Sequence, residues 1–220
     1  KKRFGIGYYP VSQAEKIAEQ RKSGHEIVRS QFLMKNGIED NGQKVLVYFG
    51  GNNEEYFSKA FPAFLCLISK SSGKINLQNH IVVIQQHPGA KVKNQEGQQV
   101  EAWLKEFGEQ TIMPKLIISD LSSDAAQVLA DAALYYQTSM GPQFVLGGIP
   151  TIQIGHETYE DILVRNRLAP TVTNANEFVE VIKSLEAMGA RPQEDLLNSL
   201  GIKQDWPDRL EDVIKNLLSE

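Results

Sequence analysis

The sequence predicts an α/β fold: a doubly wound, Rossmann-like parallel sheet of about six strands with helices on both faces and extra C-terminal helices. Three observations lead to this expectation. Between residues 44 and 170, short apolar runs alternate with helical patterns. Polar residues do not interrupt these runs, which is typical of strands buried on both faces of a parallel sheet. Beyond residue 174 the helical patterns continue without strands, so the last helices should pack on the outside.

The apolar runs and the segments between them place the expected elements. We expect strands at residues 45–49, 80–84, 116–118, 132–136 and 151–154. We expect crossover helices at residues 54–68, 100–107, 123–130, 142–146 and 159–167. Pro62 predicts a kink or a break in the first of these helices. Asn174 can cap the next helix. The C-terminal helices are expected at residues 175–188, 192–200 and 207–218.

The first 43 residues differ from the rest of the chain. They show a helical pattern over residues 12–29, and Asn-Gly pairs at 36–37 and 41–42 then indicate turns. We interpret residues 1–43 as a helical lead-in or interdomain linker, with a simple N-terminal extension as the alternative, and residues 44–220 as the α/β domain. The chain begins without Met, so a fragment or a processed form is one interpretation.

Composition excludes several classes of function. A net charge of -4 argues against general binding of nucleic acids or anionic membranes, because both need a basic surface. The apolar runs are shorter than the ~20 residues of a membrane-spanning helix. Cys66 is the only cysteine and lies in an apolar run, so we expect a buried free thiol. With no disulfide framework, a reducing compartment is indicated, and we expect a cytoplasmic protein.

Two loops at expected strand ends have features of a binding site. In an open α/β sheet, ligands bind beyond the carboxyl ends of the strands, at the switch point. Gly50, Gly51 and Asn52 follow the first strand, and two glycines let a ligand approach the backbone closely. His87 lies in a His-Pro step after the second strand and is the histidine best placed for a polar role. The alternatives are a tight turn and a rigid surface loop.

Two further loops follow the fourth and fifth strands. Ser139, Met140 and Gly141 precede a short helix, and a helix N-terminus with a hydroxyl group suits a diphosphate. The alternative is that Ser139 is a plain N-cap. Glu157 lies after the fifth strand, where a carboxylate could accept hydrogen bonds from sugar hydroxyls. The nearby Glu160 and Asp161 are better explained as acids at a helix N-terminus.

Motifs for other chemistry are absent from the sequence. There is no HxxEH or CxxC spacing for a metal and no GxSxG nucleophile elbow. We therefore expect no metal site and no bound cofactor. The candidate residues are positioning groups and dipoles, and a reaction at such a site would need no metal ion.

Several segments resemble one superfamily. Residues 116–150 read LIISDLSSDAAQVLADAALYYQTSMGPQFVLGGIP. This is similar to the donor-binding segment of glycosyltransferase-B enzymes, with an Ala-Asp pair after a helix, a strand ending at Ser, and a helix closing on small-Gly-x-Pro. The segment YFGGNN resembles the glycine loop that opens the C-terminal domain of lipid-linked N-acetylglucosamine transferases. The segment QQHPGAK looks like the His-Pro loop shared with UDP-N-acetylglucosamine 2-epimerases. The resemblance covers residues 44–187.

The resemblance implies roles for particular residues. Ser139, Met140 and Gly141 would contact the diphosphate of a nucleotide sugar, and the backbone from Ile118 to Leu121 would contact the base. The superfamily usually has a Glu that holds the ribose hydroxyls, and Gln143 stands at that position. A neutral amide loses the charge-assisted hydrogen bond, which is roughly twice as strong as a neutral one. Weaker nucleotide affinity or a different donor is therefore expected.

The resemblance also implies a function and a missing half. Residues 44–220 would be the donor-binding domain of a metal-independent glycosyltransferase that transfers a hexosyl or N-acetylhexosaminyl group, with a UDP-linked sugar as substrate. Acceptor binding would need an N-terminal domain or a partner subunit, through which any peripheral membrane association would also occur. The alternatives are a non-catalytic interaction module of the same fold and an enzyme similar to UDP-sugar 2-epimerases, although Met140 and the residues after it favour transfer over epimerisation.

Overall fold

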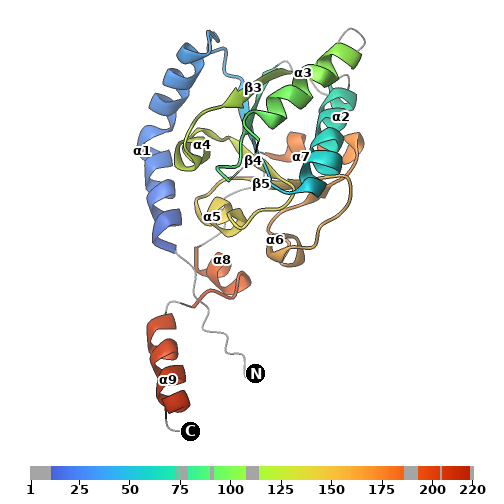
Figure 1. Ribbon diagram of the computed structural model, residues 1–220. Helices are drawn as coiled ribbons and strands as arrows, with labels where there is room; N and C mark the ends of the chain where they lie inside the picture. Colours follow the sequence, from blue (N-terminus) through green and yellow to red (C-terminus); the bar gives the residue numbers. More distant parts are fainter. Residues whose placement is uncertain are drawn as a thin grey trace.

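The computed structural model describes residues 11–72, 74, 79–89, 92–107, 114–185, 193–203 and 205–218. Within them the chain forms one six-stranded, fully parallel sheet (Figure 1). The strands are β1 (Lys44–Phe49), β2 (His80–Gln85), β3 (Lys115–Ser119), β4 (Ala132–Tyr135), β5 (Thr151–Ile154) and β6 (Thr171–Val172). Five of them match the apolar runs. The sixth strand, β6, has only two residues and is too short to be detected by periodicity.

The strand order is β3-β2-β1-β4-β5-β6. The chain therefore builds one half of the sheet outward from β1, crosses back, and builds the other half outward from β4. Ligand crevices of doubly wound sheets lie where the order reverses, beyond the carboxyl ends of the two central strands. Here that point lies between β1 and β4. Register pairs Phe49 with Tyr135 at their ends.

One face of the sheet is covered by α1 (Val11–Lys35), α4 (Ser123–Leu129) and α5 (Gly141–Leu146) (Figure 1). Alternate residues of β1 point to this face, and Val45, Val47 and Phe49 pack with Phe32 of α1 and Phe144 of α5. The helix predicted at residues 12–29 is longer in the structure, where α1 runs from Val11 to Lys35, and it contributes to the core. It ends before Gly37, whose positive φ of 61° forms the predicted turn.

The other face is covered by a π-helical turn at Tyr56–Ala60, α2 (Phe61–Ser71), α3 (Gln95–Phe107) and α7 (Ala175–Ser184). Leu46 and Tyr48 of β1 point to this face, and the ring of Tyr48 stacks on that of Phe64 with centroids 4.0 Å apart. Because both faces of β1 are buried, the strand has no polar alternation. This is the physical reason for the unbroken apolar run in the sequence.

Pro62 disturbs the helix that contains it, as predicted. The turn before it is π-helical, and the N–H of Phe61 donates to the carbonyl of Tyr56, five residues back. Pro62 then lies in the first turn of α2 and, because it has no N–H, makes no hydrogen bond back to the preceding turn. The proline therefore separates a π-helical turn from an α-helix without ending the helical path.

The remaining helices are α6 (Ile162–Arg165), α8 (Gln193–Ser199) and α9 (Trp206–Leu218). The first is shorter than the predicted 159–167, because Asp161 caps it with hydrogen bonds of 2.9 and 3.0 Å to the N–H groups of Leu163 and Val164. Residues 186–192, at the predicted end of one helix and start of the next, lie outside the described residues. No residue of α9 is buried, and Figure 1 shows it at the bottom of the view, apart from the sheet and the helices that cover it.

Hydrogen bonds join the predicted lead-in segment to the α/β domain. Arg29 of α1 donates to Asp40 at 2.8 Å and to the carbonyl of Gln43 at 2.7 Å, which ties the end of α1 to the start of β1. The domain division at residue 43 stays a prediction. Among the described residues, no helix combines the length and apolarity that are required to cross a lipid bilayer.

Candidate functional site

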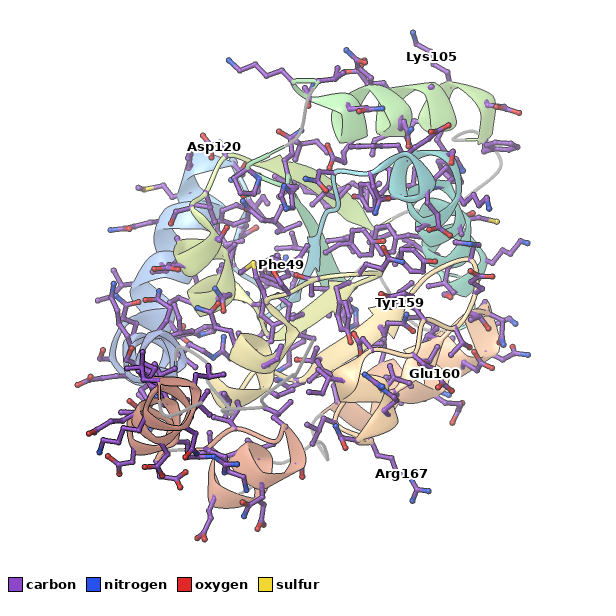
Figure 2. The ribbon with its side chains drawn as sticks, turned by 60° about the horizontal axis from the view of Figure 1, so that its bottom comes forward. Phe49, Lys105, Asp120, Tyr159, Glu160 and Arg167 are labelled. Carbon is purple, nitrogen blue, oxygen red and sulfur yellow. The ribbon has the colours of Figure 1, made fainter. Side chains whose placement is uncertain are left out.

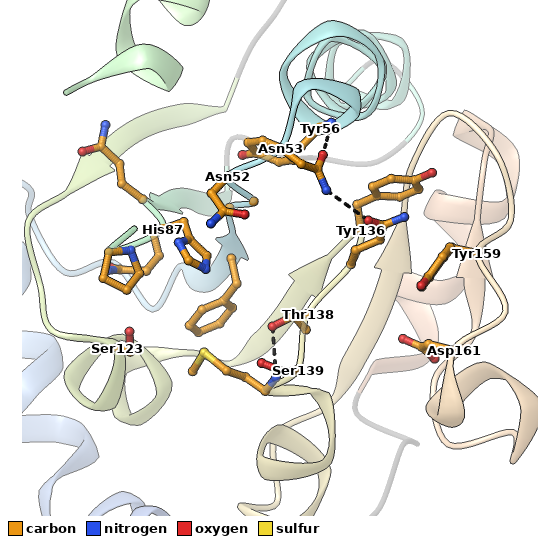
Figure 3. Close-up of a pocket in the computed structure, with 18 residues that line it drawn as sticks. Asn52, Asn53, Tyr56, His87, Ser123, Tyr136, Thr138, Ser139, Tyr159 and Asp161 are labelled. Carbon is orange, nitrogen blue, oxygen red and sulfur yellow. Dashed lines mark hydrogen bonds between the residues drawn. The ribbon is translucent and has the colours of Figure 1, made fainter. Parts of the chain in front are cut away.

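A cavity of about 450 Å³ lies at the switch point, beyond the carboxyl ends of β1, β2 and β4 (Figure 3). This volume is within the range of small-molecule sites. Figure 2 shows Phe49, the last residue of β1, near the centre of the molecule. The described residues that line the cavity are Phe49, Gly50, Gly51, Asn52, Asn53, Tyr56, Gln85, Gln86, His87, Pro88, Ser123, Tyr136, Gln137, Thr138, Ser139, Met140, Tyr159 and Asp161.

The loop after β1 is packed so closely that a side chain at position 50 would not fit. The N–H of Gly50 donates to the carbonyl of Gln85 at 2.9 Å, which holds the loop against the end of β2. A Cβ atom on Gly50 would lie 2.8 Å from Oε1 of Glu96 and 3.0 Å from the hydroxyl of Tyr56. The glycine is therefore required by the groups behind the loop, and its backbone is left to line the cavity.

Glu96 is a buried acid directly behind this loop, in the first turn of α3. Its side chain is 0% exposed, and among the described residues neither carboxylate oxygen has a hydrogen-bond partner of good geometry. Burial raises the pKa of Glu96, and the Tyr56 hydroxyl beside it offsets only part of this effect. Glu96 thus supports the glycine loop from the side opposite the cavity.

A hydrogen bond joins the loops on the two sides of the switch point. Nδ2 of Asn53, after β1, donates to Oε1 of Gln137, after β4, at 3.3 Å (Figure 3). The carbonyl oxygen of the same Asn53 side chain accepts the N–H of Tyr56 at 2.7 Å and so caps the helical segment. Asn53 therefore fixes the relative position of the two halves of the cavity wall.

His87 reaches the cavity from the loop after β2. Its Nδ1 accepts the N–H of Gly89 at 2.9 Å. In the neutral ring the proton is then on Nε2, which can donate to a ligand. Figure 3 shows the imidazole beside Asn52, with Ser139 across the cavity. Residues 90 and 91 of the same loop lie outside the described residues.

The loop after β4 brings Ser139 and Met140 to the cavity. Ser139 is exposed, no described group pairs with its hydroxyl, and α5 begins at Gly141 without a side-chain cap. Ser139 is therefore not the N-cap that the alternative interpretation proposed. The N–H of Met140 donates to the hydroxyl of Thr138 at 3.1 Å and holds the loop in place.

The electrostatics of the cavity are neutral to acidic. None of its described lining residues is Lys or Arg, and Asp161 is the only carboxylate among them. Asp161 accepts a 2.7 Å hydrogen bond from the buried hydroxyl of Tyr135. Burial raises the pKa of Tyr135, and the contact with Asp161 raises it further. The phenol therefore remains a proton donor to the carboxylate.

Beside the cavity, three groups that can bind a metal come together. Nε2 of His156 lies 3.5 Å from a carboxylate oxygen of Glu55 and 3.5 Å from one of Glu157. The hydroxyl of Tyr136, whose ring lines the cavity, donates to the same Glu55 oxygen at 3.4 Å. Spacing in the sequence did not predict this cluster, because Glu55 follows β1 and the other two follow β5.

The predicted site residues divide into three groups. Gly50, Gly51, Asn52, His87, Ser139 and Met140 line the cavity together. Leu121 lines an adjoining cavity of about 310 Å³ that shares Gln85, His87 and Ser123 with the first. The others lie outside both linings. Ile118 packs into the core, Gly141 is buried against Leu163, Gln143 is part of α5, and Glu157 joins the cluster beside the cavity.

Other lining residues were missed by sequence reasoning. Tyr136, Gln137 and Thr138 belong to the loop already singled out after β4, so only their individual roles were overlooked. Asp161 was assigned to the helix N-terminus and does cap α6, yet it also faces the cavity. Tyr159 gives no signal in the sequence, because an exposed aromatic residue in a loop has no pattern that marks a site.

Comparison with known proteins finds similarity only at the level of structure. No protein-family model and no curated protein matches the sequence. A UDP-forming α,α-trehalose-phosphate synthase from Burkholderia xenovorans matches with a TM-score of 0.62 and 14% identity, over 97% of this chain and 52% of the synthase. An α,α-trehalose 6-phosphate synthase from Burkholderia multivorans matches with a TM-score of 0.59 and 12% identity, over 98% and 50% of the two chains.

A UDP-GlcNAc 2-epimerase from Neisseria meningitidis, solved with UDP-GlcNAc bound, matches with a TM-score of 0.53 and 12% identity, over 98% of this chain and 55% of the epimerase. The chain thus spans about half the length of each of these proteins. At such low identity the likeness concerns the fold alone. The chain has the fold of one half of these proteins. The resemblance of its sequence to glycosyltransferase-B enzymes is thereby confirmed for the fold alone.

Proposed function

We propose that this chain is the donor-binding half of a nucleotide-sugar-dependent glycosyltransferase. The observation that carries the proposal is the convergence of the Gly50-Gly51 loop, His87 and Ser139 on one cavity at the switch point of a doubly wound sheet. This is where such sheets bind nucleotides. The names of the similar structures support it, since one is a UDP-forming synthase and another was solved with UDP-GlcNAc bound.

The chemistry of the lining suggests how a nucleoside diphosphate would be held. Nε2 of His87, the hydroxyl of Ser139 and the amide of Asn52 are neutral donors around the cavity, and the glycine loop allows phosphate oxygens to approach its backbone. The adjoining cavity beside Leu121 would take the base. Preorganised donors of this kind can stabilise a diphosphate leaving group as negative charge develops on it.

The proposed reaction needs a second half. The chain spans about half of the similar enzymes, so acceptor binding and the catalytic base would come from an N-terminal domain or a partner subunit. On this proposal the protein works in the cytoplasm on a UDP-linked hexose or N-acetylhexosamine. The chain alone would bind the donor without transferring its sugar.

Nucleotide binding tests the proposal directly. We expect ligand-observed NMR to detect binding of UDP and UDP-GlcNAc to the protein at millimolar concentration, with GDP as a comparison. Ser139→Ala should weaken binding, whereas Ser184→Ala, an exposed serine on α7, should leave it unchanged. If none of these nucleotides binds to the folded protein, the proposal is wrong.

A second candidate function is a non-catalytic interaction module of the same fold. Gln143 in place of an acidic residue and the lack of Lys and Arg among the described lining residues favour it. This candidate predicts that Ser139→Ala leaves the protein's activity in cells unchanged, while changes on the exposed face of α9 disturb it. A nucleotide affinity that falls in the Ser139→Ala variant would exclude it. Conversion of UDP-GlcNAc to its C2 epimer by the chain would instead favour an epimerase.

A further inference from the structure

The cluster of Glu55, His156 and Glu157 has the spacing of ligands around one metal ion. Zinc bonds to histidine nitrogen are about 2.0–2.1 Å and those to carboxylate oxygen about 2.0–2.2 Å. In a tetrahedron, two ligands at these distances lie roughly 3.3–3.5 Å apart. Nε2 of His156 lies 3.5 Å from each of the two carboxylate oxygens. All three donor atoms lie within 4.8 Å of one another.

Mutual hydrogen bonding explains this arrangement poorly. A distance of 3.5 Å is beyond the usual range for an N–H···O hydrogen bond, so His156 is close to both carboxylates without a good bond to either. Nδ1 of the same ring is buried and has no partner among the described residues. A cation bound at Nε2 would offset the negative charge of both carboxylates, with the ring proton on Nδ1.

The surroundings hold the cluster in place. The hydroxyl of Tyr136 makes a long hydrogen bond of 3.4 Å to the Glu55 oxygen that faces His156. The rings of Tyr136 and His156 are in contact, with centroids 5.2 Å apart. A Cβ atom on Gly155 would lie 2.2 Å from the Tyr136 ring, so only glycine lets the chain bring His156 beside it. The cluster is thus built by packing as well as by charge.

We propose that Glu55, His156 and Glu157 bind a divalent transition-metal ion, with Zn²⁺ as the representative ion. Imidazole and carboxylate ligands suit this class, and three protein ligands leave a coordination position open for water or an exogenous oxygen. The site has no counterpart in the sequence motifs, and it departs from the expectation that the protein holds no metal.

The site lies at the rim of the cavity, because Tyr136 lines the cavity and also touches His156 and Glu55. The cavity's described lining offers no Lys or Arg to a diphosphate. A bound dication would add positive charge near it and strengthen nucleotide binding. This consequence rests on the proposed function, whereas binding of the metal does not.

Calorimetric titration of the protein, without a histidine tag, with ZnCl₂ tests the site. We expect one ion to bind per chain. Bound Co²⁺ should give visible d–d absorption, which disappears when Zn²⁺ displaces the Co²⁺. Changes behind metal ligands cost about 10–100-fold in affinity, so loss of a ligand should cost at least about 10-fold. His156→Ala and Glu157→Gln are the test variants, and the second alters a side chain that is 64% exposed.

Two matched variants serve as controls. Glu160→Gln removes an exposed carboxylate on the same segment (Figure 2), and His25→Gln removes a histidine near carboxylates of Glu26 and Asp131 elsewhere. Both should bind Zn²⁺ as the parent protein does. Absence of binding at millimolar ZnCl₂ would overturn the proposal, as would equal affinity in the Glu157→Gln and parent proteins.

A nucleotide titration separates this inference from the proposed function. If Zn²⁺ binds at the site and UDP does not bind at all, the metal site stands and the proposed function fails. If UDP binds and no metal does, the proposed function stands and the metal site is excluded. Tighter UDP binding with Zn²⁺ than with EDTA, lost in Glu157→Gln, supports both.

Discussion

Arg21 of α1 should be a large single contributor to the stability of the scaffold around the cavity. Its Nη1 donates to the carbonyls of Gln127, Val128 and Ala130 at 2.8, 3.2 and 2.6 Å. These carbonyls lie at the end of α4, where helices leave acceptors unsatisfied and their dipole favours a cation. Burial lowers the pKa of Arg21, and Asp131 nearby opposes that effect.

The cost of removing this guanidinium follows from these contacts. Hydrogen bonds to charged groups contribute about 1.5–3 kcal/mol each. One nitrogen with two protons cannot make three full bonds, and water will reach some of the freed carbonyls. We therefore expect Arg21→Met, which keeps the aliphatic stem, to lose about 3 kcal/mol. For a chain of this size that lowers Tm by roughly 6–12 °C.

Thermal unfolding followed by circular dichroism measures this effect. Lys22→Met is the matched control, because Lys22 is the next residue of the same helix and is exposed. The control should stay within about 0.5 kcal/mol of the parent protein, as surface changes usually do. If Arg21→Met unfolds at the same temperature as Lys22→Met, capping of α4 by α1 contributes nothing and the reasoning is refuted.

Three other substitutions probe the groups around the cavity. Glu96→Gln should be more stable relative to the parent at pH 7 than at pH 4. The pKa of Glu96 is higher in the folded than in the unfolded protein. The contribution of this carboxyl group to folding stability is therefore fully present below the unfolded pKa of 4.5 and is lost as pH rises through the folded pKa. Tyr135→Phe should cost about 1.5–3 kcal/mol, because it removes the 2.7 Å hydrogen bond to the Asp161 carboxylate. Gly155→Ala should cost about 1–3 kcal/mol through the clash with Tyr136. Urea unfolding at the two pH values measures all three.

Each of these expectations has an outcome that would contradict it. A Glu96→Gln effect that is the same at pH 4 and pH 7 would mean that the buried carboxyl group does not titrate differently in the folded state. Tyr159→Phe, at an exposed tyrosine, is the control for Tyr135→Phe, and equal effects would show that the hydrogen bond to Asp161 contributes nothing. A Gly155→Ala variant as stable as the parent would mean that the Tyr136 ring moves aside freely.

The sequence predicted those features that depend on local chemistry. Val45 to Phe49 form an unbroken apolar run because the strand is buried on both faces, and that burial leaves its mark in the residues themselves. Gly50 and Gly51 mark a loop because only small residues fit there, and Pro62 marks a disturbed helix because it lacks an N–H. Each of these signals lies within a few residues of the structure that it predicts.

Other features could not be read from the sequence, because they depend on which segments become neighbours. The two residues of β6 form a strand only because β5 offers an edge to pair with. Glu96 is polar and at the start of a helix, which suggests exposure, yet the packing of α3 buries it behind Gly50.

The candidate site separates the two levels. The sequence by itself determined that strands would end in glycine, histidine and serine loops, since backbone propensity and burial act over short stretches of chain. Only the tertiary structure decided that β4 lies beside β1, which brings Ser139 to the Gly50 loop, and that β5 follows, which sets His156 beside Glu55. Convergence of distant groups depends on the strand order, and that order is set by long-range packing, which no local pattern encodes.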